Sequence, residues 1–232
     1  MKRILRFCLC GIIVAVSALI NGCTSVPVTG RSHLSGLVSD TEVVRMSVEQ
    51  FEQMKAQYPI SRNATYRDML QRVGDRIAEV AQFDILNAEW EFIVFDDPSA
   101  INAFAMAGGK VGVFTGLFNV IETDDDLAIV IGHEISHVAA KHVHERLSKA
   151  MLGQGLGLGM LAGLGGSATV SSQVILQAYG MGSQAIGLGF NRQMEKEADH
   201  IGLLYAARAG FDPQVLQLIC IHVHNFWQVG SG

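Results

Sequence analysis

The sequence predicts one α+β domain that is mostly helical and carries a small β-sheet. Apolar side chains recur at helical spacing in residues 41–58 and 65–81. Residues 89–95 alternate as a strand does, residues 111–114 fit a shorter strand, and helical patterns dominate from residue 123 onward. With 232 residues, 49% of them hydrophobic, the chain is long enough to bury a sizeable core.

The first 22 residues have the three parts of an export signal. Lys2, Arg3 and Arg6 form a positively charged start, and residues 7–20 are apolar and uncharged. This apolar stretch is too short to span a membrane comfortably. We therefore expect residues 1–22 to be a signal peptide rather than part of the fold.

The signal ends in Ile-Asn-Gly-Cys at residues 20–23, which resembles a lipobox cleaved before Cys23. Cys23 is the predicted lipidation site and residues 23–38 the predicted tether, since two or more acyl chains anchor a protein stably. Thr24 after the cysteine is typical of lipoproteins on the periplasmic side of the outer membrane, if the source is a double-membraned bacterium. The alternative is an uncleaved N-terminal anchor, and either version holds the chain at a membrane.

Charge and cysteine content narrow the possible partners. Loss of the signal removes three basic residues, which changes the formal net charge from −5 to −8. A moderately acidic surface argues against nucleic acid as a partner. Cys8 and Cys10 leave with the signal, so Cys220 is the only cysteine besides Cys23 and no intramolecular disulfide is expected.

Two histidines in the pentapeptide His-Glu-Ile-Ser-His, residues 133–137, have the spacing of metal ligands. On a helix, His133 and His137 leave the same face one turn apart, so both rings can reach one Zn²⁺ at about 2.0–2.1 Å. Glu134 lies where it can reach a water at the metal without binding the metal itself. The competing interpretation is a core helix with incidental histidines, but a buried histidine pair needs partners and a metal would satisfy both rings.

The surrounding residues predict that this helix is capped and buried. Thr123 and Asp126 form a capping-box pattern, and residues 127–131 are continuously apolar. We expect the helix to continue beyond the pentapeptide and to become amphipathic, with His142 and His144 on its surface.

A catalytic zinc requires a third protein ligand. The metzincin pattern is excluded, because Ala140 and Val143 stand where that pattern has glycine and histidine. The best remaining candidate is Glu195, with Asp199 one helical turn later as a partner for a ligand histidine or for a reaction intermediate. Glu197 is expected on the opposite side, and an acidic, solvated helix face is the alternative interpretation of this segment.

Three ordered motifs resemble one family of gluzincin metallopeptidases. His-Glu-x-x-His is followed by Asn-Arg-x-x-Glu-x-Glu-Ala-Asp-x-x-Gly at residues 191–202 and preceded by Asn-Ala-Phe-Ala-Met-Ala-Gly-Gly-Lys-Val at residues 102–111. The family includes the CAAX prenyl endopeptidases, the heat-shock peptidase HtpX and the mitochondrial Oma-type peptidases. The chain especially resembles its bacterial periplasmic members, such as the β-barrel assembly-enhancing protease, over approximately residues 40–215.

The resemblance implies a zincin-like metallopeptidase domain over residues 39–232, with the small sheet beside the catalytic helix. It also implies one Zn²⁺ per chain and a strand edge on which substrate backbone can lie. The residues implied are His133, His137 and Glu195 as zinc ligands, Glu134 as general base, Asp199 as an assisting group, and Asn102, Ala103 and Phe104 as substrate contacts.

Together these features predict a zinc-dependent endopeptidase of the bacterial cell envelope that trims misfolded or stalled envelope proteins. The expected partners are protein or peptide substrates, the membrane, and the outer-membrane assembly machinery. The alternative from a different class is a chaperone-like lipoprotein of outer-membrane assembly whose zinc site is structural or silent.

Two stretches allow more than one interpretation. Residues 151–190 contain no acidic or basic side chain, and we favour a helical hairpin packed through its glycines over an apolar lid. After residue 213 the resemblance leads us to expect a His-Pro element, which the sequence lacks. His222 and His224 are therefore attributed to a disordered or truncated tail rather than to a metal site.

Overall fold

The computed structural model describes residues 23–26, 28–34, 38–85, 88–150, 172–179, 191–212 and 214. The predicted signal peptide, most of the charge-free stretch, and the tail with Cys220, His222 and His224 lie outside these residues. The side chain of Cys23 also lies outside the described part.

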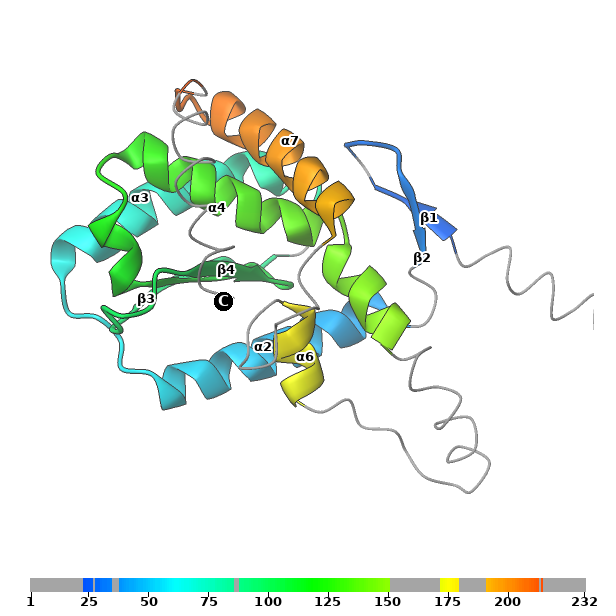
Figure 1. The fold of residues 1–232 in the computed structure, drawn as a ribbon, viewed down its shortest axis with the longest axis horizontal. Coiled ribbons are helices and arrows are strands. Elements are labelled where there is room, and N and C mark those ends of the chain that lie inside the picture. Colours follow the sequence, from blue (N-terminus) through cyan, green and yellow to red (C-terminus); the bar gives the residue numbers. More distant parts are fainter. Residues whose placement is uncertain are drawn as a thin grey trace, which may run out of the picture.

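A three-stranded mixed sheet lies at the centre of the domain (Figure 1). It consists of β3 (Glu91–Phe95), β4 (Ala103–Met106) and β5 (Lys110–Phe114) in the order β3-β5-β4. β3 is parallel to β5 and β4 is antiparallel to it, so β4 is an edge strand.

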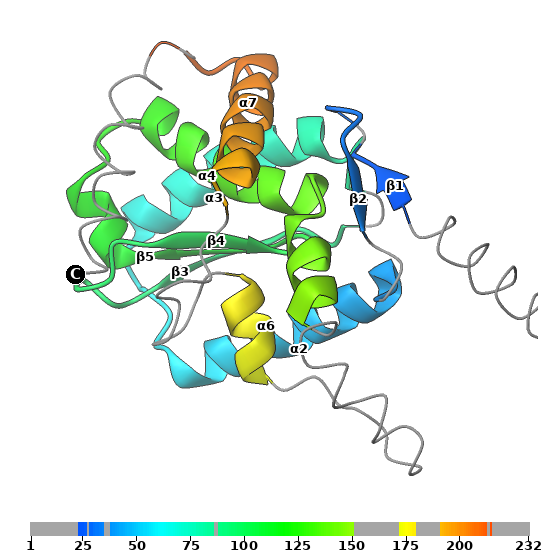
Figure 2. The same cartoon turned by 45° about the vertical axis from the view of Figure 1, so that its right-hand side comes forward.

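Helices cover both faces of this sheet, as the two views in Figures 1 and 2 show. On one side α3 (Ala64–Ala81) and α4 (Asp124–Ala139) contact the sheet, and α7 (Arg192–Arg208) packs on the outside of α4. On the other side α2 (Asp40–Gln57) contacts the sheet and α6 (Ser172–Ala178) packs on α2. The 3₁₀ helix η1 (Thr115–Asn119) follows β5. The predicted mostly helical α+β fold with a small sheet is confirmed.

Helical spacing in the sequence places α2 and α3 within one residue of their observed ends. Each begins after a polar cap, because Ser39 accepts a hydrogen bond from the Glu42 N–H and Asn63 accepts one from the Tyr66 N–H. Such a cap satisfies one of the backbone donors that a helix N-terminus leaves unpaired.

Aromatic side chains fill the layer between α2 and the sheet. The ring of Phe51 on α2 lies 6.1 Å from that of Phe95 and 6.2 Å from that of Phe104, edge to face in both pairs. Aromatic pairs contribute about 0.5–1.5 kcal/mol beyond the burial of their area. This cluster therefore holds α2 against the face of the sheet opposite to α4.

Part of the charge-free stretch is described and packs as a helix. Tyr179, directly after α6, places its hydroxyl 2.6 Å from the Ser47 hydroxyl on α2, and it accepts a hydrogen bond from the Ala107 N–H (2.9 Å). This contact ties α6 both to α2 and to the end of β4. Within the described residues, no helix combines the length and the apolar character needed to cross a membrane.

The segment expected to be a tether contains a short hairpin. β1 (Cys23–Ser25) and β2 (Ser32–Leu34) pair as an antiparallel hairpin, and Val26 between them is buried. The Gly30 N–H donates to the Val26 carbonyl and closes the turn. A short hairpin that buries one valine leaves no periodic pattern in the sequence, so residue spacing alone does not reveal it.

The helix that carries the histidine pair ends earlier than expected. α4 stops at Ala139, Lys141 adopts a left-handed conformation with φ of 59°, and a second helical stretch covers residues 142–150. Because the chain turns at Lys141, His142 and His144 face the interior and are only 0% and 4% exposed. The prediction that these two histidines lie on the surface is wrong.

Candidate metal centre

The start of α4 fixes the histidine pair in place. Thr123 Oγ1 accepts a hydrogen bond from the Asp126 N–H (3.2 Å), and the Asp126 carboxylate accepts one from the Thr123 N–H (2.8 Å), so the predicted capping box is confirmed. Leu127 and Ile131 are fully buried. A capped helix that is buried on most sides holds the side chains of its next turns in one orientation.

Three of the predicted site residues converge on one point. Ligand atoms of His133, His137 and Glu195 all lie within 4.8 Å of one another. The two Nε2 atoms are 3.0 Å apart, and the Glu195 carboxylate oxygens lie 3.4 Å from His133 Nε2 and 3.8 Å from His137 Nε2. One face of α4 and the first turn of α7 thus bring three possible ligand atoms close together.

This arrangement fits a zinc ion by its donor set and its dimensions. Two histidines and one glutamate are a ligand set of catalytic zinc sites that keep one position open. Donors that each lie about 2.0–2.1 Å from a tetrahedral ion are about 3.4 Å apart, and the three separations in this cluster fall on both sides of that value. His133 and Glu195 are partly exposed, at 23% and 27% of their side chains, so the cluster is accessible from solvent.

A close helix crossing brings α7 to the histidines. Gly132 on α4 and Gly202 on α7 face each other, and a Cβ atom on Gly202 would lie 2.7 Å from the His133 backbone nitrogen. The helix axes can approach this closely because both residues at the crossing are glycines. The crossing places Glu195 and Asp199 of α7 directly opposite His133.

Asp199 forms a hydrogen bond with Nδ1 of His133, the ring nitrogen that points away from His137. Its Oδ1 lies 3.0 Å from His133 Nδ1. An ionised carboxylate can only accept a hydrogen bond, so His133 Nδ1 carries a proton and Nε2 is the ring nitrogen left for a metal ion. The structure therefore places Asp199 beside His133 and outside the cluster of His133, His137 and Glu195.

Comparison with known proteins decides the family. A model of peptidase family M48 matches residues 65–228, which is more than half of the chain. The chain belongs to peptidase family M48.

Similar M48 proteins come from mitochondria and from bacteria. The chain is 38% identical over 146 residues to mitochondrial metalloendopeptidase OMA1 of Arabidopsis thaliana, covering 62% of this chain and 28% of that protein. It is 37% identical over 139 residues to OMA1 of Saccharomyces cerevisiae, covering 60% and 38%. It is 28% identical over 212 residues to the β-barrel assembly-enhancing protease of Escherichia coli, covering 86% and 41%.

The matched region thus spans less than half the length of each of these three relatives. The suspected family is confirmed. The predicted enzyme class is confirmed for the domain, which is a metallopeptidase domain with endopeptidase relatives.

Sequence patterns did not reveal two residues that lie beside the cluster of His133, His137 and Glu195. His142 Nδ1 lies 2.9 Å from His137 Nδ1, and His142 Nε2 lies 3.0 Å from a Glu197 carboxylate oxygen. Glu197 is buried, which contradicts the interpretation of this position as part of a solvated face. On an unbroken helix, a residue five positions on lies about 140° around the axis, so spacing gave no reason to pair His142 with His137.

The charges of the cluster shift its pKa values. Burial lowers the pKa of His133, but hydrogen bonds to Asp199 and Glu195 and the nearby carboxylates outweigh it and raise this pKa to about 10. The pKa of His137 lies well below its ordinary value because of burial and the neighbouring positive charge of His133. The carboxylates around His133 thus favour a positive charge at this ring.

Glu134 is half-buried next to the first histidine of the pair. Burial, with a smaller contribution from the charge of Glu195, raises the pKa of Glu134 to about 7, although His133 opposes the shift. A carboxylate held in such surroundings can accept a proton and return it. Glu134 is thus suited to proton transfer rather than to a surface role.

The predicted substrate contacts lie at the edge of the sheet. Ala103 and Phe104 are buried in β4, and Asn102 directly precedes this strand. Among the described residues, only β5 pairs with β4, so the far edge of β4 has no strand partner there. With both side chains buried, any contact that Ala103 and Phe104 make to a peptide has to come from the backbone.

Proposed function

We propose that this chain is a zinc-dependent endopeptidase of the bacterial cell envelope that cleaves misfolded or stalled envelope proteins. The observation that carries the proposal is the convergence of His133, His137 and Glu195 beside Glu134. This combination of three ligands and an adjacent carboxylate is the minimum that metal-assisted amide hydrolysis requires.

Glu134 and Asp199 have different roles in the proposed reaction. A bound zinc ion would supply a Lewis acid for the scissile carbonyl and lower the pKa of a water molecule. Glu134 accepts the proton of the attacking water and passes it to the leaving amine. Asp199 keeps the His133 ring in the orientation that its hydrogen bond defines.

The edge of β4 is the proposed binding surface for substrate. A peptide in extended conformation would add a strand there, through backbone hydrogen bonds. Asn102 supports this placement, because its side-chain oxygen is buried and has no hydrogen-bond partner within the described part of the chain. Recognition through the backbone implies broad sequence specificity.

Removal of metal tests the proposed activity. We expect casein cleavage by the full-length protein to fall to background after treatment with a chelator and to return on addition of zinc. Addition of calcium serves as the control, because calcium prefers six to eight oxygen ligands and this site offers two imidazoles. Cleavage that persists in protein shown by elemental analysis to be free of metal would contradict the proposal.

Anchoring at the envelope is the second part of the proposal, and Cys23 is its basis. The β1–β2 hairpin begins at Cys23, so a lipid on this residue would place the domain close to the bilayer. Mass spectrometry of the protein purified from membranes is expected to show a chain that starts at Cys23 and carries covalent lipid. A membrane-bound chain that retains residues 1–22 would indicate an uncleaved anchor, and a soluble chain without lipid would contradict anchoring.

A further inference from the structure

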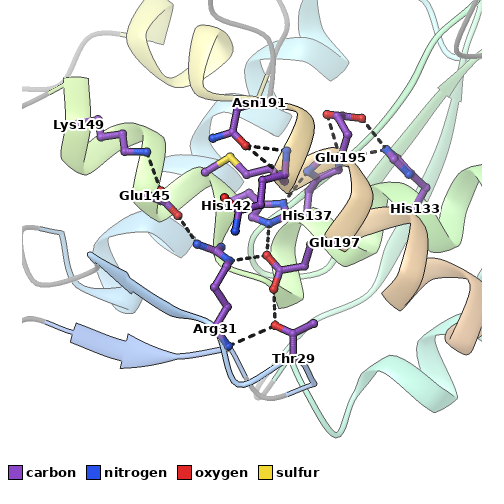
Figure 3. A network of polar contacts seen from close by, with 12 residues as sticks. Thr29, Arg31, His133, His137, His142, Glu145, Lys149, Asn191, Glu195 and Glu197 are labelled. Atoms are coloured by element: carbon purple, nitrogen blue, oxygen red, sulfur yellow. Dashed lines mark hydrogen bonds and ion pairs between the residues drawn. The ribbon is translucent and has the colours of Figure 1, made fainter.

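His142 touches the metal centre from the side opposite to the proposed metal position. The chain changes direction at Lys141, so that the helical stretch 142–150 begins with its first side chain against α4. His142 is fully buried, and its Nδ1 lies 2.9 Å from His137 Nδ1. Figure 3 shows this ring between His137 and Glu197.

Hydrogen-bond geometry determines which nitrogen atoms of His137 and His142 carry protons. Glu197, as a carboxylate, can only accept, so His142 Nε2 carries a proton and donates it across 3.0 Å. The other nitrogen of a neutral His142 is then an acceptor, and His137 Nδ1 has to be the donor. The lone pair of His137 Nε2 consequently faces His133 and Glu195.

The two ligand histidines are therefore supported in parallel ways. His133 donates directly to the carboxylate of Asp199, and His137 donates through His142 to the carboxylate of Glu197. Partners behind metal-ligating histidines fix the tautomer and ring orientation. The two carboxylates lie two residues apart on α7, but their surroundings differ.

Glu197 is held by the N-terminal hairpin. Its carboxylate accepts hydrogen bonds from Thr29 Oγ1 and, at 2.5 Å, from Arg31 Nε, both in the segment that joins β1 to β2. Arg31 Nη1 also lies 2.8 Å from the carboxylate of Glu145, and Glu145 contacts Lys149 at 2.6 Å. Figure 3 shows the hairpin beneath this network, on the side away from Glu195.

We propose that His142 and Glu197 are positioning residues that set His137 for metal binding, and that Arg31 of the N-terminal hairpin completes this support. The inference rests on the zinc site of the proposed function. It assigns to the segment near Cys23 a direct structural part in that site, in addition to its place next to the proposed anchor.

Zinc affinity of the full-length protein tests the proposal without an activity assay. We expect His142→Phe to weaken zinc binding by about 10–100-fold, as loss of such partners does in other metal sites. Glu197→Gln, which keeps the volume of the side chain, and Arg31→Gln are expected to lower affinity less. The matched control is Lys149→Ala, because Lys149 contacts Glu145 but neither histidine, and this variant should bind zinc as wild type does.

Nitrogen NMR of the imidazole rings supplies a readout that loss of packing alone does not change. In metal-free wild type, His137 is expected to show a protonated Nδ1 and an unprotonated Nε2, and in Glu197→Gln a mixture of both tautomers. Equal zinc affinity in wild type, His142→Phe and Glu197→Gln would overturn the proposal, as would an unchanged tautomer in Glu197→Gln. If His142→Phe does not fold, Glu197→Gln and the NMR signal decide. Failure of wild type to bind zinc would instead contradict the proposed function.

Discussion

Replacement of Glu134 by glutamine is expected to lower kcat for peptide cleavage by about 10²–10⁴-fold, the usual contribution of a general acid–base group. Glutamine has nearly the same shape but cannot take a proton from water. The zinc affinity should stay close to that of wild type, because Glu134 is not among the three converging ligands. Parallel measurements of kcat and of bound zinc separate the loss of proton transfer from the loss of metal.

The matched control is Glu122→Gln, which removes an exposed carboxylate just before the same helix and should leave kcat unchanged. Full cleavage by Glu134→Gln with zinc bound would refute the assigned role of Glu134. If Glu134→Gln abolishes cleavage while the function in the envelope survives undiminished, that result would favour the chaperone-like alternative.

Replacement of Gly202 by alanine is expected to separate α7 from α4 and to weaken the metal centre. The new Cβ would lie 2.7 Å from the His133 nitrogen and 2.9 Å from the Gly132 carbonyl carbon, and neither backbone atom can move independently of its helix. Overpacking of this kind costs about 1–3 kcal/mol of unfolding free energy. Since Glu195 and Asp199 lie on the displaced helix, zinc affinity should fall as well.

Ala207→Gly is the matched control for this experiment. Residue 207 is exposed on the same helix, and glycine there costs about 1 kcal/mol through helix propensity without touching α4. Denaturant unfolding should show both variants destabilised, whereas zinc titration should show weakened binding only for Gly202→Ala. Wild-type zinc affinity in a folded Gly202→Ala protein would show that the crossing does not control the site.

Periodic features of this chain could be predicted from sequence because each depends on neighbours a few positions away. The capping box at Thr123 and the ends of α2 and α3 are of this kind. His133 and His137 were paired by spacing, and their convergence with Glu195 also required the resemblance to a family, since spacing alone left a solvated acidic face as the alternative.

Features that depend on distant or irregular contacts could not be predicted in this way. β4 is buried on both sides and therefore lacks the alternation that marks a half-exposed strand. The left-handed conformation of Lys141 is rare for residues other than glycine, and the spacing of apolar residues around it does not indicate a turn. Without that turn, the pairing of His142 with His137 cannot be inferred.

The docking of α7 has a consequence for the order in which the molecule is assembled. Arg31 and Glu197 are 166 positions apart, and contacts between distant segments form slowly because a long loop has to close first. A growing chain holds the hairpin and both histidines well before Glu195 has been synthesised. Docking of α7 therefore brings Glu195 to the histidine pair, and a chain interrupted before residue 195 would hold only two of the three converging side chains.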